Sequence, residues 1–270
     1  MSVKKDPSGR RSIQVEVEVP GTPEEVWRAI ATGPGISAWF VPTRSEERQG
    51  GEQVCNFGPG MDSPSTITVW QPPVRFAAEG DMGGPGSPKV ATEWTIEARA
   101  GGKCLVRVVH SLFATTDDWD GQLTGLEDGW PAYFRILRMY LTHFTGLSSS
   151  AMHFVAFSKE SQAQAWDKAG GKLGLLKLAE GQKWSAPQGV PRMAGVVEFL
   201  GSASHKSTLL LRLDTPAPGA AYVGAFSCGG MVMVCLSVYL YGDQAKSAIE
   251  RDEPAWQQWI GEQFPMPQMG

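Results

Sequence analysis

The chain has 270 residues, a formal net charge of −4 and 42% apolar residues, so it can bury the core of one large or two ordinary domains. Charged residues make up only 19%, whereas Gly (32), Pro (19) and Trp (10) are plentiful. This composition is typical of globular proteins rich in turns and sheet, and it excludes a disordered chain. No basic stripe with interleaved aromatic residues occurs, which disfavours a nucleic-acid partner.

The N-terminal segment and the cysteines bear on location and metal binding. MSVKKDPSGRR is basic but no apolar run follows it, which predicts a flexible arm and no signal peptide. The cysteines form no CxxC pair and have no histidine at zinc-ligand spacing, which predicts buried reduced thiols and no metal site. They are Cys55, Cys104, Cys228 and Cys235. Together these features predict a cytoplasmic protein.

The first strong pattern is a strand that runs into a capped helix. SIQVEVEV, residues 12–19, alternates apolar and polar side chains, as a half-buried strand does. Thr22 then supplies a helix N-cap and Glu25 its capping-box partner. We expect Gly33-Pro34-Gly35 to end this helix and a short second turn to carry Trp39 and Phe40.

Several strand-like runs and one long helical pattern follow. The runs are GGEQVCNF, STITVWQ, VRFAAEG, KVATEWTIEARA and KCLVRVVHSLF. GWPAYFRILRMYLTHF then repeats its large apolar residues at spacings of four and three, which predicts a helix with one apolar stripe. The stripe is Trp130, Phe134, Leu137, Leu141 and Phe144. Antiparallel strands followed by such a helix predict an α+β architecture in which a curved sheet wraps around the helix.

One uncharged stretch, Thr215 to Gly242, is long enough to cross a bilayer. Gly229-Gly230 interrupts it between two runs rich in Val, Phe and Tyr, which is a hairpin signal. No cluster of Lys or Arg flanks the stretch as an anchor would require. We therefore predict two strands buried on at least one face and no membrane insertion, with a transmembrane span as the alternative.

The ordered set of motifs from Ser12 to Leu147 resembles the START-like (SRPBCC) superfamily, and within it the homologues of the heat-shock-protein-90 ATPase activator. The motifs are TPEEVWRAIATGPGISAWF, VWQPPVRF, TEWTIEARAGGKCLVRVVHSLF and GWPAYFRILRMYLTHF. The resemblance implies a helix-grip fold with a cavity between the sheet and the last helix. Members mostly bind apolar small molecules or lipids, and a minority are cyclases or aromatases. The activator itself is a larger co-chaperone with an additional chaperone-binding domain, and nothing in this chain resembles that domain.

The second half repeats the strand and capped helix with which the first half begins. When AMHFVAFSKESQAQAWDKA is laid under SIQVEVEVPGTPEEVWRAI without gaps, Ser161 falls on Thr22 and Trp166 on Trp27. Strand, hydroxyl cap, capping-box partner and Trp therefore recur in register. The match predicts a second, degenerate helix-grip copy in tandem with the first.

We accordingly expect two domains, residues 12–147 and 150–264. The second contains the strand-like runs AGVVEFLG, STLLLRLD, AAYVGAF and MVMVCLSVYLYG. A closing helix from Asp243 to Phe264 is expected to be interrupted or restarted at Pro254.

Few residues carry a signal for chemistry, because GxSxG, P-loop and HExxH motifs are all missing. In VRVVHSLF the alternation places His110 on the inner side of its strand. There it either hydrogen-bonds a ligand or acts as a base, or it is a core histidine paired within the protein. Thr92 and Asn56 are the other candidate inward polar groups of this half. No catalytic residue, metal ligand or cofactor is predicted.

An acidic set precedes the long helix and lacks the spacing of a calcium-binding loop, so we interpret it as a solvated loop with a capping role. The set is Asp117, Asp118, Asp120, Glu127 and Asp128.

The predicted function is the non-enzymatic binding of an apolar small molecule or lipid in the cavity of the first domain. Two alternatives stay open: an enzyme of cyclase or aromatase type acting on a hydrophobic substrate, and a co-chaperone-like protein-interaction module. The expected ligand-binding residues can equally be plain core. They are Trp39, Phe40, Thr92, Trp94, Ile96, Val108, His110, Trp130, Phe134 and Leu137.

Overall fold

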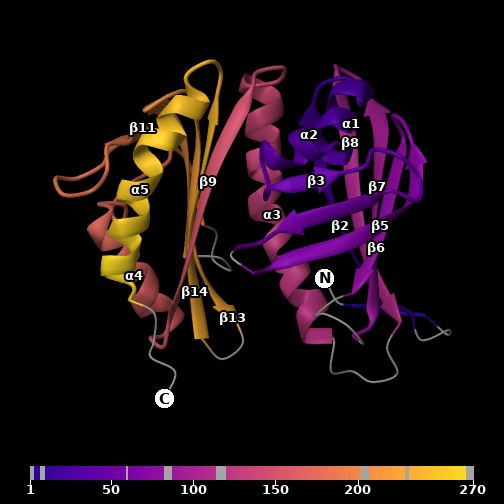
Figure 1. The fold of residues 1–270 in the computed structure, drawn as a ribbon, viewed down its shortest axis with the longest axis horizontal. Helices are drawn as coiled ribbons and strands as arrows, with labels where there is room; N and C mark the ends of the chain where they lie inside the picture. Colours follow the sequence, from indigo (N-terminus) through magenta and orange to yellow (C-terminus); the bar gives the residue numbers. More distant parts are fainter. Residues whose placement is uncertain are drawn as a thin grey trace. The chain divides into compact units, whose positions relative to one another are not determined.

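The computed structural model describes residues 3–6, 10–58, 60–81, 87–113, 120–201, 207–228 and 231–265. The chain divides into two compact units, Met1–Thr145 and Gly146–Gly270. Each unit consists of one antiparallel sheet with its own helices (Figure 1).

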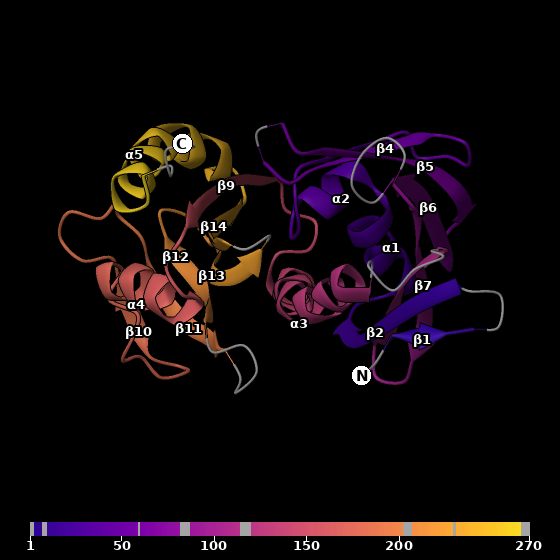
Figure 2. The same ribbon diagram turned by 90° about the horizontal axis from the view of Figure 1, so that it is seen from below.

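The first unit is an eight-stranded sheet that curves around its helices (Figure 2). Its strand order is β1-β2-β8-β7-β6-β5-β4-β3, so the first long strand pairs with the last strand before the closing helix. The elements are β1 (Lys4–Lys5), β2 (Arg10–Pro20), α1 (Pro23–Ala31), α2 (Gly33–Ser37), β3 (Thr43–Ser45), β4 (Glu52–Asn56), β5 (Asp62–Gln71), β6 (Arg75–Asp81), β7 (Lys89–Arg99), β8 (Lys103–Phe113) and α3 (Asp120–His143).

The second unit has a six-stranded sheet in the order β10-β11-β12-β13-β14-β9. Its elements are β9 (Ser149–Ser158), α4 (Gln162–Lys172), β10 (Lys183–Ser185), β11 (Ala194–Leu200), β12 (Thr208–Thr215), β13 (Gly219–Cys228), β14 (Met231–Tyr241) and α5 (Ala245–Gln263). Again the first strand pairs with the last, and the remaining strands follow as a meander. The predicted fold, an α+β helix-grip with a second copy in tandem, is confirmed.

Both copies begin with the same local structure. In α1 the Glu25 amide donates to Thr22 Oγ1 at 3.3 Å, and the Thr22 amide donates back to Glu25 Oε2 at 2.8 Å. In α4 the Gln164 amide donates to Ser161 Oγ at 3.4 Å, and the Ser161 amide donates to Gln164 Oε1 at 3.1 Å. Each pair satisfies two backbone donors that the first helical turn leaves free. The capping boxes read from the sequence are therefore present in both copies.

One local expectation was met in part and two were wrong. Helix α1 ends before Gly33, as predicted, but Gly33-Pro34-Gly35 itself forms the first turn of α2, with Thr32 Oγ1 accepting from the Gly35 amide at 3.1 Å. Helix α5 runs through Pro254 without interruption. Helix α3 starts at Asp120, ten residues before Trp130, and continues through Pro131.

That early start also corrects the acidic loop. Asp120, Glu127 and Asp128 lie within α3, whereas Asp117 and Asp118 lie outside the described residues.

The uncharged stretch forms a hairpin, as predicted. Strands β13 and β14 pair from Gly219↔Leu240 to Cys228↔Met231, and the turn at Gly229-Gly230 lies outside the described residues. The missing charges follow from burial on both faces, because the neighbours Val238 and Tyr239 are each 0% exposed. Within the described ranges, none of the helices combines the length and apolarity that crossing a bilayer requires.

Candidate functional site

The candidate site lies on one face of the first sheet, which we call the inner face because His110 on it contacts Trp130 of α3. Residues directly opposite one another on antiparallel strands share a face. The His110 row of the inner face is therefore Ile13, His110, Thr92, Ala78 and Ile67, from β2 to β5. A parallel row, the Gln53 row, is Arg11, Leu112, Val90, Gly80, Ser65, Gln53 and Ser45.

His110 is held by two side chains from different elements. Trp130 Nε1 donates to His110 Nε2 at 2.6 Å, and His110 Nδ1 lies 2.9 Å from Thr92 Oγ1. An indole N–H can only donate, so Nε2 is the unprotonated nitrogen and the neutral ring donates through Nδ1–H to the Thr92 oxygen. Burial lowers the pKa of His110 to about 4, because the charged form would lose its hydration. The imidazole is thus neutral at pH 7 and fully paired.

The polar atom that this arrangement leaves available belongs to Thr92. Its oxygen accepts from His110, while its hydroxyl proton has no acceptor among the described residues. Thr92 is also partly exposed, although His110 beside it is only 5% exposed. The Trp130–His110–Thr92 chain therefore fixes the position of one hydroxyl group on the inner face.

Aromatic rings surround Trp130 and continue to the surface. Ring centroids lie 5.0 Å away for Trp94, 5.4 Å for Phe134 and 5.3 Å for Phe40. Phe40 in turn lies 5.8 Å from Phe57, a side chain that is 41% exposed. An unbroken series of rings thus leads from solvent to His110.

The structure separates the predicted ligand-binding residues into two groups. One group is packed as core, with exposures of 7% or less: Trp39, Trp94, Ile96, Val108, Phe134 and Leu137. The other group consists of Trp130 and His110, which are buried, and of Phe40 and Thr92, which are partly exposed. Beyond Thr92, Val90 and Ser65 of the Gln53 row are also partly exposed although they lie on the inner face. The residues around Trp94 are therefore packed as core. The accessible part of the inner face, which we call its open half, is limited to Thr92, Val90, Gly80 and Ser65, because Ala78, Ile67 and Leu112 beside them are buried.

Two buried polar residues of the inner face were missed by sequence reasoning. Arg11 is 6% exposed and sits opposite Leu112; it escaped notice because the predicted strand began one residue later. Gln53 is 7% exposed and lies between Ser45 and Ser65. Asn56 had been expected to point inward instead.

The placement of Asn56 follows from strand parity. It lies on the opposite face of β4 from Gln53, and its Nδ2 donates to Asp62 Oδ1 at 2.6 Å. Whether Gln53 or Asn56 faces inward depends on the pairing register of β4 with β5, and the sequence does not show that register.

The second copy has no such polar chain at the matching positions. Met152 pairs with Val238 and Val238 with Ala221, as Ile13 pairs with His110 and His110 with Thr92. Val238 and Ala221 are both 0% exposed. They belong to a continuous apolar core that includes Met152, Phe154, Val197, Leu209, Leu211, Leu213, Leu236, Leu240 and Trp256.

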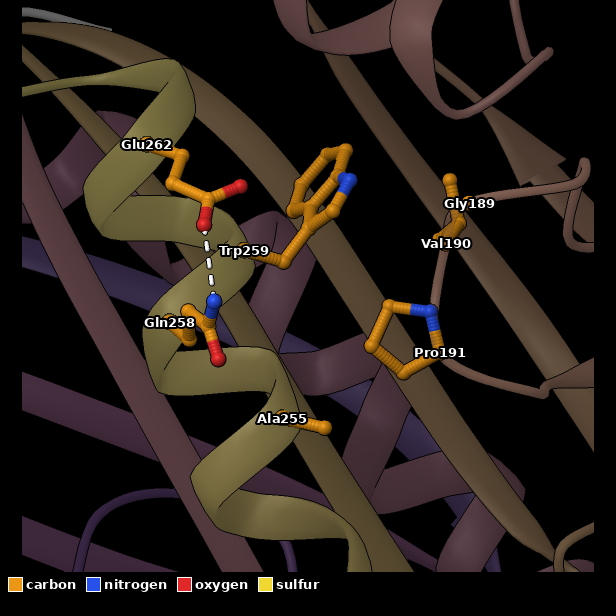
Figure 3. A pocket seen from close by; sticks show the side chains of 7 residues that line it. All are labelled: Gly189, Val190, Pro191, Ala255, Gln258, Trp259 and Glu262. Carbon is orange, nitrogen blue, oxygen red and sulfur yellow. Dashed lines mark hydrogen bonds between the residues drawn. The ribbon is translucent and has the colours of Figure 1, made fainter.

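A surface groove of about 320 Å³ in the second unit lies between residues 189–191 and helix α5 (Figure 3). Trp259 forms its apolar wall. Its polar side chains, Gln258 and Glu262, are exposed and hydrogen-bonded to each other at 2.9 Å. The groove therefore presents no buried polar group that would orient a ligand.

Burial raises the pKa of the three cysteine thiols whose side chains the structure describes, which makes them poor nucleophiles. Cys55, Cys104 and Cys235 are free, and burial raises the pKa of Cys235 to about 12. A raised pKa keeps the thiol protonated and therefore weakly nucleophilic.

Part of the chain matches a known protein family. Residues 10–136 match the family described as "Polyketide cyclase / dehydrase and lipid transport". The first unit is therefore similar to the START-like (SRPBCC) superfamily over most of its length. No curated protein matches the chain.

Several solved structures are similar to the chain. The di-domain ARO/CYC BexL from the BE-7585A biosynthetic pathway is 12% identical over 95% of this chain and 99% of its own, with a TM-score of 0.45. DynU16, from the dynemicin biosynthetic locus, is 17% identical over 92% of this chain and 94% of its own, with a TM-score of 0.44. Aha1 from Colwellia psychrerythraea is 16% identical over 48% of this chain and 95% of its own, with a TM-score of 0.41.

Proposed function

We propose that the first unit binds an apolar small molecule or lipid on the open half of its inner face, without converting it. The apolar body would lie against Trp130 and Phe40, and the hydroxyl of Thr92 would donate to an oxygen atom of the ligand. Phe57 and Phe40 would form the entrance.

The observation that carries this proposal is the partly exposed Thr92 hydroxyl at the end of a buried hydrogen-bonded chain. Trp130 and His110 fix its position, so little conformational entropy is lost when it meets a ligand. Small-molecule sites typically combine such a placed polar group with predominantly apolar and aromatic walls.

Binding is favoured over catalysis because His110 has no free nitrogen. A general base must accept a proton within hydrogen-bond reach of its substrate and works best with a pKa near the operating pH. His110 Nε2 is occupied by Trp130, and burial holds the pKa of the ring at about 4. A cyclase reaction would have to take its proton acceptor from elsewhere.

The expected affinity is modest. A ligand that loses about 300 Å² of apolar surface gains about 7 kcal/mol at roughly 25 cal/mol per Å², before the cost of ordering. This corresponds to a Kd in the micromolar range or weaker.

Titration with Prodan, a neutral naphthalene fluorophore with one carbonyl group, tests the proposal. We expect saturable binding to the full chain and about fivefold weaker binding to Thr92→Val, the ratio typical of one neutral hydrogen bond. Phe134→Ala should also change the affinity, because it removes a ring that packs against Trp130.

Thr95→Val is the matched control, since it makes the same change on the opposite face of β7 and should leave Prodan binding unaltered. Absence of saturable binding to the folded chain would overturn the proposal and favour the protein-interaction alternative. Retained binding with conversion of a hydrophobic substrate would favour the cyclase alternative.

A further inference from the structure

A second polar patch lies on the inner face of the first sheet, formed by Gln53 of β4 and Ser45 of β3. The two residues are directly opposite each other in the strand register, and Ser65 follows on β5. Gln53 is 7% exposed, whereas Glu52 beside it on the other face is exposed.

One side-chain polar atom of each of these two residues lacks a partner. Gln53 Nε2 and Ser45 Oγ are buried, and neither forms a hydrogen bond with any residue that the structure describes. Buried side-chain polar atoms in proteins nearly always have a partner, because leaving one unpaired costs its full desolvation energy. Two such atoms on one face of neighbouring strands indicate that a further group completes them.

The chemistry of the patch defines that group. A carboxamide N–H only donates, and a hydroxyl can donate as well, so the missing partner is a hydrogen-bond acceptor. The part of the Gln53 row from Ser45 to Val90 contains no charged residue. A neutral oxygen of carbonyl type therefore fits better than a carboxylate, which would be buried without a counter-charge.

The patch and Thr92 are separated by the width of a small apolar molecule. Three strand-to-strand steps lead from β7 to β4, which is on the order of 14 Å at about 4.8 Å per step. Between them, Gly80 and Ser65 of the Gln53 row are small and partly exposed, whereas Ala78 and Ile67 of the His110 row are buried beside them.

We propose that Gln53 and Ser45 form a second polar subsite, which accepts a carbonyl-type oxygen at the end of the ligand opposite to Thr92. The ligand would be an elongated neutral molecule with an oxygen acceptor at each end and an apolar body across β5 and β6. This proposal rests on the binding function proposed above.

The series biphenyl, 4-acetylbiphenyl and 4,4′-diacetylbiphenyl separates the two ends of the site. These probes share one apolar body and carry no, one or two carbonyl groups. Displacement of Prodan from the full chain gives the affinity of each probe. We expect the second acetyl group to improve the affinity about fivefold in wild type, as one more neutral hydrogen bond would.

Gln53→Met keeps the length of the side chain and removes the donor. It should abolish the gain from the second acetyl group while 4-acetylbiphenyl binds as before. Ser45→Ala should reduce the gain by a smaller factor, and it provides the same test if the methionine variant does not fold. Gln71→Met, at an exposed position of β5, is the matched control and should retain the gain.

A gain that persists in both Gln53→Met and Ser45→Ala would overturn the second subsite and leave the patch as a site for internal water. The first proposal survives that result, because Thr92 still accounts for the first acetyl group. If no member of the series displaces Prodan, both proposals are wrong.

Discussion

The two copies of the helix-grip fold share a topology and differ in what fills them. In the first, the central row of the inner face carries His110 and Thr92; in the second, the same positions carry Val238 and Ala221. The second interior is an aliphatic and aromatic core that needs no polar partner. The first keeps polar side chains inside: His110 is fully hydrogen-bonded, whereas Gln53 Nε2 and Ser45 Oγ have no partner among the described residues.

This contrast shows which features the fold itself needs and which are better explained by a binding site. A helix-grip sheet folds without buried polar groups in the central row of its inner face, as Met152, Val238 and Ala221 of the second copy demonstrate. The buried polar groups of the first copy are therefore dispensable for the architecture, and burying them carries a desolvation cost. A function of that interior accounts for their presence better than stability does.

The largest expected effect on stability comes from a mutation in the core of the second copy. Leu209→Ala removes a fully buried side chain, and we expect it to cost about 2–5 kcal/mol in the free energy of unfolding, from lost burial and the cavity left behind. Prodan affinity should stay unchanged, because the variant lies outside the proposed site. Urea denaturation and the fluorophore titration measure the two quantities.

Leu176→Ala is the matched control, since Leu176 is 46% exposed and its truncation should change stability little. The contrast between a structural and a binding copy would fail if Leu209→Ala abolished probe binding while the first copy stayed folded.

The next effect is the pH dependence of stability. Burial lowers the pKa of His110 to about 4 from its ordinary value of 6.5, so between these values the unfolded chain binds a proton that the folded chain does not. Stability should therefore fall as the pH falls from about 6.5 to 4, by about 3 kcal/mol for this residue.

His153 in the second copy is half-buried, with Ser237 Oγ 3.0 Å from its Nδ1, and the loss of hydration around its ring also lowers its pKa to about 4. Denaturation at several pH values should show that His110→Gln and His153→Gln each remove about half of the pH dependence. If His110→Gln left it unchanged, the neutral hydrogen-bonded imidazole described for the first copy would be wrong.

The sequence predicted the architecture well because the features that set it are local. Alternation from Ser12 to Val19, the two capping boxes and the stripe that begins at Trp130 all depend on residues close together in the chain. The inward orientation of His110 also followed from alternation, and the structure agrees.

The partners of His110 and the role of Gln53 did not follow from the sequence, because they depend on pairing between distant strands. Trp130 reaches His110 from another element, and Gln53 faces inward only through its register with Ser65. A shift of that register by one residue would have placed Asn56 inside, as the sequence interpretation assumed.

The smallest expected effect tests where the two copies should be alike. Thr22→Ala and Ser161→Ala each remove a side-chain acceptor from a helix N-terminus, and each should cost about 1 kcal/mol in the unfolding free energy. Glu24 and Glu25 favour the N-terminus of α1 through the helix dipole, whereas α4 has no acidic residue in its first turn. Those carboxylates remain in Thr22→Ala, so the two losses should agree within a few tenths of a kcal/mol.

Thr22→Ser and Ser161→Thr, which retain an acceptor, should keep most of the wild-type stability when measured by urea denaturation. Costs that differed by more than about 1 kcal/mol would show that equal hydrogen-bond geometry does not give equal stabilisation, and that the second copy has diverged in its architecture as well as in its interior.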